Sequence, residues 1–90
     1  MPLYVRTLLL TGAPEEVQPS CRAHEQHLAR LRKQGKLRTA GAFKDGDGYL
    51  EILEAEDRHE AESITRSSPL VEAGWASWML REWDELALDD

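Results

Sequence analysis

One feature limits the possible folds of this chain more than any other. It is an amphipathic helix that ends at a glycine and is followed directly by a strand. The helix is predicted from Ser20 to Gln34, with residues at one-turn spacing forming a narrow apolar stripe. Basic residues in its last turn suit the C-terminal dipole, and Gly35 can take the left-handed cap conformation. Pro14, followed by two glutamates, can also begin the helix earlier. A strand over 36–44 is predicted to follow.

The rest of the chain supplies three more strands, a hairpin turn and a second helix. Two Asp-Gly steps provide the positive φ that a tight hairpin needs. Pro69 disfavours helical backbone at the residue before it and so ends the second helix. In chain order the predicted elements are a strand over 3–11, a turn over 45–48, a strand over 49–55, a helix from Asp57 to Ser68 and a strand over 75–83.

This order, β-α-β-β-α-β, predicts one α+β domain over residues 1–90 with a ferredoxin-like fold, in which both helices cover one face of an antiparallel sheet. A domain of this length buries only a modest core. The first and last strands are apolar on both sides, so the uncovered face is expected to meet another surface. We predict a homodimer in which the sheets of two copies meet face to face.

Composition bears on the partners and the location of the protein. The formal net charge of -6 disfavours nucleic acid and anionic membranes, which select basic surfaces. Basic residues do cluster over 30–38, where we interpret them as a solvated helix end. No signal peptide or membrane-spanning stretch is predicted. Cys21 is the single cysteine and is interpreted as a small buried hydrophobe, which fits a cytoplasmic protein.

His24 is the unusual residue of the helix, because its ionisable imidazole lies on the apolar stripe. One interpretation is a buried imidazole bonded to a backbone carbonyl; the other is a general acid or base held between helix and sheet. A metal site shared with His27 lacks a third ligand, and a catalytic pair with Cys21 lacks an orienting group and an oxyanion hole. We predict neither a metal nor a cofactor.

His24 together with GKLRTAG (Gly35 to Gly41) and SPLVEAGW (Ser68 to Trp75) resembles the YciI (YCII-related) family of small dimeric α/β-barrel proteins. The resemblance implies a dimeric α/β barrel with a histidine at the active site, and counting back from Gly35 selects His24 rather than His27. The family commonly has an aspartate that pairs with this histidine at the end of the second helix. Ser68 stands at that position here.

The resemblance implies a small-molecule enzyme, since relatives are linked to dehalogenation of chlorinated aromatic compounds and the wider superfamily includes muconolactone isomerases and cofactor-free monooxygenases. We predict proton transfer by His24 beside Ser68 in a small cavity, with Arg6, Phe43 and Trp75 contacting an unknown small molecule. A serine cannot stabilise an imidazolium as a carboxylate does. The alternatives are a non-catalytic ligand-binding or accessory dimer and a purely structural interaction module. For Ser68, a helix-capping role is favoured over that of a nucleophile.

Overall fold

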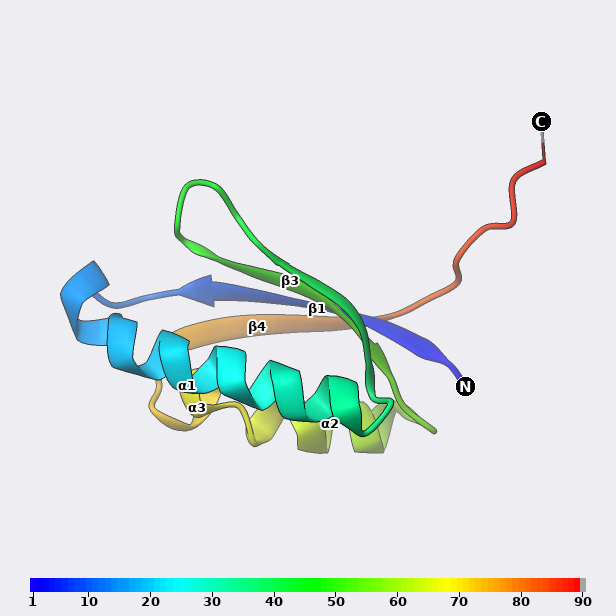
Figure 1. Ribbon diagram of the computed structural model, residues 1–90, viewed down its shortest axis with the longest axis horizontal. Helices are drawn as coiled ribbons and strands as arrows, with labels where there is room; N and C mark the ends of the chain where they lie inside the picture. The colour runs from blue at the N-terminus through cyan, green and yellow to red at the C-terminus, as the bar shows by residue number, and fades with distance from the viewer. Residues whose placement is uncertain (90) are drawn as a thin grey trace.

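The computed structural model describes residues 1–89, and Asp90 at the end of the predicted tail lies outside the described residues. A four-stranded antiparallel sheet in the order β2-β3-β1-β4 carries its helices on one face (Figure 1). The predicted ferredoxin-like fold is thereby confirmed. The elements are β1 Leu3–Leu10, α1 Pro14–Lys33, β2 Leu37–Ala42, β3 Gly48–Glu54, α2 Arg58–Arg66, α3 Pro69–Glu72 and β4 Ala76–Trp83.

Helix α1 begins at Pro14, so the start predicted at Ser20 was wrong and the earlier alternative was correct. Proline suits the first helical turn because its missing N–H would find no partner there, and Glu16 Oε1 accepts a hydrogen bond from the Ala13 N–H at 3.3 Å. The helix ends as predicted near Gln34, and Gly35 takes a left-handed φ of 74°. Val17 in the first turn of α1 is buried.

The segment predicted as a plain connection after the second helix contains a further helical turn, α3. Ser68 caps this turn, with its Oγ accepting a hydrogen bond from the Leu70 N–H at 3.2 Å. Pro69 follows as the first helical residue and separates α3 from α2. The capping role expected of Ser68 is confirmed, although the helix it caps was not predicted.

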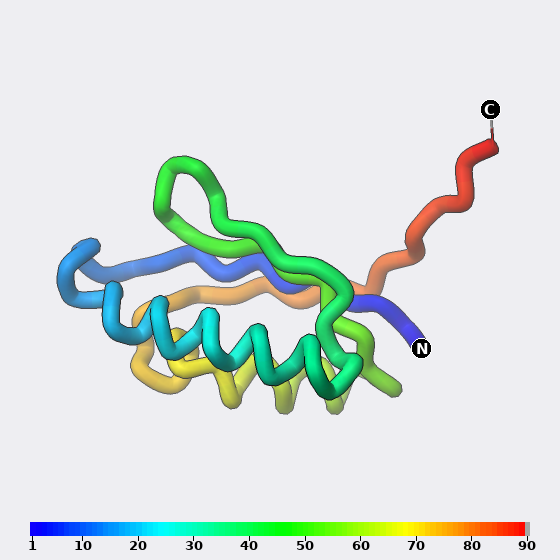
Figure 2. Tube along the Cα trace, in the orientation of Figure 1, coloured from blue at the N-terminus to red at the C-terminus, as the bar shows by residue number. Residues whose placement is uncertain are grey.

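The two faces of the sheet differ because successive side chains of a strand point to opposite sides. The trace shows α1, α2 and α3 together on one side of the four strands (Figure 2). On that side Tyr4, Leu8, Leu53 and Leu80 are buried and form much of the core. The opposite side is uncovered, and its larger apolar side chains are considered below with the site.

Candidate functional site

Four buried polar side chains form a chain of hydrogen bonds between the sheet and the helices. Arg6 of β1 lies directly opposite Glu51 of β3, and its Nε donates to Glu51 Oε1 at 2.5 Å. The other carboxylate oxygen, Oε2, lies 2.5 Å from His24 Nε2 of α1. The second ring nitrogen, Nδ1, lies 2.9 Å from the Oγ of Ser68. All four side chains are completely buried.

The charge of Glu51 sets the hydrogen-bond directions in this chain. Burial alone raises the pKa of the Glu51 carboxyl, but the hydrogen bond from His24 and the positive charge of Arg6 outweigh burial and leave the pKa below its usual value. An ionised carboxylate only accepts hydrogen bonds, so His24 Nε2 carries a proton. Ser68 then donates to Nδ1 of a neutral imidazole, or accepts from Nδ1 of an imidazolium. The arrangement therefore accommodates both protonation states of His24.

Two more aromatic rings lie close to the His24 imidazole. The ring of Tyr49 has its centroid 4.9 Å away, and its hydroxyl donates to Glu25 Oε2 at 3.0 Å. Burial raises the pKa of Tyr49, so its hydroxyl stays protonated. His27, one turn along α1, has its ring centroid 6.0 Å away. Burial and then the charge of Arg6 lower the pKa of His27 to about 4, so this ring is neutral at pH 7.

The structure brings together three of the five residues predicted for the site. His24 and Ser68 are in direct contact, and Arg6 joins them through Glu51, as half of a buried ion pair rather than as an open ligand contact. Phe43 follows β2 and is 37% exposed, outside this hydrogen-bond chain. Trp75 is half-buried before β4 and packs in an apolar cluster, also outside the chain.

Glu51 is the member of this hydrogen-bond chain that the sequence did not predict. Glu51 lies between Tyr49 and Leu53 on one face of its strand. In the same way, Arg6 lies between apolar residues on one face of β1. Two opposite charges, each on an otherwise apolar strand face, are a detectable signal, since buried charges are usually paired. The ferredoxin-like topology places these two strands side by side, so the predicted fold already implied that Arg6 and Glu51 could meet.

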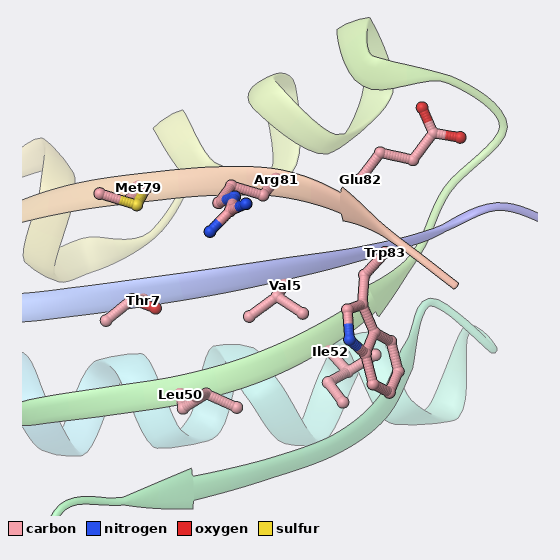
Figure 3. A pocket seen from close by; sticks show the side chains of 8 residues that line it. All are labelled: Val5, Thr7, Leu50, Ile52, Met79, Arg81, Glu82 and Trp83. Atoms are coloured by element: carbon pink, nitrogen blue, oxygen red, sulfur yellow. The ribbon is translucent and has the colours of Figure 1, made fainter. Parts of the chain in front are cut away.

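The uncovered side of the sheet carries a separate, mainly apolar hollow of about 400 Å³ (Figure 3). In Figure 3 the Trp83 ring lies beside Ile52, and Arg81 and Met79 project from β4 over the same surface. The register places these side chains on the face opposite to Arg6 and Glu51. The lining residues are Val5, Thr7, Leu50, Ile52, Met79, Arg81, Glu82 and Trp83.

Metal-binding and membrane-spanning features were searched for in residues 1–89. No three or more His, Cys, Asp or Glu side chains in this range lie together so that they could hold a metal ion. None of the helices in the same range combines the length and apolar character needed to cross a membrane.

A family model described as the YCII-related domain matches residues 4–84. The uncharacterised protein YjpA from Bacillus subtilis is 32% identical over 77 residues, which cover 84% of this chain and 91% of that protein. A solved structure of 5-chloro-2-hydroxyhydroquinone dehydrochlorinase (TftG) from Burkholderia phenoliruptrix, in complex with 2,5-dihydroxybenzoquinone, has a TM-score of 0.80 at 22% identity and covers 91% of this chain and 93% of its own. Rv0793 from Mycobacterium tuberculosis has a TM-score of 0.54 at 14% identity, covering 100% of this chain and 98% of its own. The two solved structures share the fold.

Proposed function

The chain belongs to the YCII-related domain family, and from this premise we propose that it is a small-molecule enzyme in which His24 transfers a proton. The observation that carries the proposal is the buried chain from Arg6 through Glu51 and His24 to Ser68. Both ring nitrogens of His24 have partners, so the imidazole is held in one orientation. An oriented imidazole is the commonest general acid or base near neutral pH.

Glu51 takes over the part that the family resemblance gives to an aspartate at position 68. Its carboxylate, bonded to His24 Nε2, stabilises the imidazolium that forms when the ring accepts a proton at Nδ1. Ser68 lies at that nitrogen, so we propose that its hydroxyl relays the proton. Ser68 Oγ takes a proton from the substrate while passing its own proton to Nδ1. In this chain the carboxylate therefore lies at Nε2 of the ring, and a hydroxyl lies at Nδ1.

A small polar ring compound is the proposed substrate class. Support comes from the solved structure of the same fold, a dehydrochlorinase of a chlorinated hydroxyhydroquinone in complex with a dihydroxybenzoquinone. Such compounds carry acidic hydroxyl or ring protons, which a histidine base can remove. Proton transfer or loss of a leaving group from a hydroxylated ring is therefore the reaction to test first.

Replacement of His24 tests the proposal. We expect His24→Gln to abolish turnover in a screen of hydroxylated and halogenated ring compounds, while circular dichroism shows an intact fold. The matched control is His59→Gln, because His59 is exposed on α2 and lies outside the buried chain. Equal turnover by the wild-type protein and the His24 variant would contradict a role for this imidazole.

A second candidate is a non-catalytic ligand-binding or accessory protein. Complete burial of His24, Glu51 and Ser68 favours it, because a substrate must displace neighbouring side chains to reach the imidazole. The two candidates differ in a simple measurement. A binder raises its melting temperature with the ligand by mass action, without converting the ligand to product.

We also propose that two copies associate through their uncovered sheet faces. Leu9, Leu50, Met79 and Trp83 lie on this face and are 38% to 60% exposed, which is unusual for large apolar side chains that share one surface. The hollow in Figure 3 gives a second copy a concave surface to fill. A twofold axis lying between the two sheets would let each copy present the same patch to the other.

A further inference from the structure

A cleft of about 270 Å³ between α1 and α2 has a mainly polar lining. None of its lining residues is acidic, although the whole chain carries a net charge of -6. Two cations, an amide, two hydroxyls and an imidazole face this space instead. The polar lining consists of His27, Arg30, Gln34, Lys36, Ser63 and Ser67.

The two cations of the cleft are not equally engaged. Lys36 Nζ lies 3.0 Å from Glu60 Oε2, and both side chains are partly exposed. Arg30 is exposed, and among residues 1–89 it has no carboxylate within ion-pair distance. Arg32 and Lys33 belong to the same helix end but do not line the cleft. The basic residues near the end of α1 therefore fall into two groups. Arg30 and Lys36 border the cleft, whereas Arg32 and Lys33 do not.

His27, one of the residues that line the cleft, carries a buried polar atom without a partner. His27 is 7% exposed, and within residues 1–89 its Nε2 is buried and makes no hydrogen bond. The same holds for Nη2 of Arg6, whose charge is close enough to His27 to lower the pKa of that imidazole. Buried polar atoms in proteins nearly always have a partner, such as a ligand or an ordered water. An oxygen atom entering past His27 would provide one.

We propose that this cleft binds a small organic carboxylate, with its carboxylate group between Arg30 and Lys36 and a second oxygen at His27 Nε2. Charge-assisted hydrogen bonds to a carboxylate are what a guanidinium supplies best, and the hydroxyl of Ser63 adds a further donor. The volume is near the lower end for ligand pockets and suits a single-ring compound. The site does not depend on proton transfer at His24.

Binding of 4-hydroxybenzoate to the full chain tests the proposal, with the uncharged 4-hydroxybenzamide as the matched ligand. We expect the acid to bind saturably in calorimetry and to shift the ring signals of His27 in NMR spectra. The amide should bind at least about tenfold more weakly, because it lacks the charge that Arg30 and Lys36 recognise. Equal affinity for acid and amide, or no saturable shift at His27 up to millimolar acid, would overturn the proposal.

A pair of surface variants locates the bound anion. Arg30→Gln should weaken binding of 4-hydroxybenzoate about tenfold, because it removes the unpaired guanidinium from the cleft. Arg32→Gln removes the same charge from the same helical turn outside the cleft, and should change the affinity by less than about twofold. Both arginines are exposed, so neither variant threatens the fold. Equal effects of the two variants would mean general attraction to basic surface and would exclude this site.

Discussion

Leu50 and Glu51 are neighbours on β3, and the burial of each is the opposite of what its polarity would suggest. Leu50 is 38% exposed on the uncovered side of the sheet, whereas the carboxylate of Glu51 is completely buried beneath the helices. The same reversal of polar and apolar burial occurs on β1 and β4, where Arg6 is buried and Met79 is 60% exposed. One face of the sheet thus hides charge, and the other displays apolar surface.

The two faces therefore support different proposals. Charge buried under the helices contributes little net stability unless its geometry is good, and apolar residues of the same volume often do as well. The burial of Arg6, Glu51 and His24 in one hydrogen-bonded cluster, in which the pKa of Glu51 is lowered, therefore supports a function for the interior. An exposed apolar sheet face supports association instead. The predictions below test each half of this contrast.

The largest effect is expected from removing half of the buried ion pair. Glu51→Leu leaves the Arg6 guanidinium buried without its carboxylate and takes the hydrogen-bond partner from His24 Nε2. We expect the free energy of unfolding in urea to fall by about 3–5 kcal/mol. The double variant Arg6→Met with Glu51→Leu removes both charges and should recover much of this loss. Additive losses in the double variant would contradict a specific pairing of the two residues.

On the uncovered face, a charge should disrupt association and leave the subunit folded. Met79→Asp places a carboxylate on the exposed apolar surface, and we expect the dissociation constant of the dimer to rise about a hundredfold. The free energy of unfolding of the monomer should change by no more than about 0.5 kcal/mol. Ala29→Asp, on the exposed side of α1, makes the same charge change away from this face. A wild-type protein that is monomeric in light scattering at micromolar concentration would refute the dimer itself.

Local signals were sufficient to predict most of the fold. Asp57 caps α2 and Gly35 ends α1, both as expected, because a cap depends on a few adjacent residues. The start of α1 was harder to place, since Pro14 and Ser20 are both acceptable N-terminal signals and the choice depends on packing. The short α3 was missed because one helical turn has no periodicity to detect.

The site was only partly predictable for a related reason. His24 was identified from the helical stripe and Ser68 from the family resemblance, which places an aspartate at its position, and the two are in contact. The carboxylate partner was not identified, because Glu51 is 27 residues from His24 in sequence and their contact depends on how the helix crosses the sheet. Strand alternation fixes the face on which Glu51 lies, but tertiary packing decides which side chain it meets.

Acid should destabilise the helix-covered face in two separable steps, and His27 gives the first. The pKa of His27 is lowered from the ordinary histidine value of 6.5 to about 4 in the folded chain. Between these two pH values the imidazole of the unfolded chain binds a proton, whereas that of the folded chain does not. The free energy of unfolding should fall by on the order of 2 kcal/mol between pH 6.5 and 4. Glu51 contributes stability that is lost only below pH 4.5, as the pH falls through its lowered pKa.

Urea unfolding measured from pH 7 to pH 4 checks this step. His27→Gln should flatten the dependence over that window, whereas His59→Gln, which changes an exposed imidazole, should retain it. An unchanged slope in the His27 variant would assign the acid sensitivity to other groups and weaken the description of this imidazole as neutral and buried.

The smallest effect concerns the end of the buried chain, where two adjacent serines provide an internal comparison. Ser68 is buried, and its Oγ contacts both the Leu70 N–H and His24 Nδ1, whereas the Oγ of Ser67 donates to one backbone carbonyl at the exposed end of α2. Ser68→Ala should therefore lower the free energy of unfolding by about 1 kcal/mol, and Ser67→Ala by only a few tenths. Denaturant unfolding of the two variants measures the difference. Equal losses would mean that the contact with His24 adds nothing to the cap, and the polar chain would then end at the imidazole.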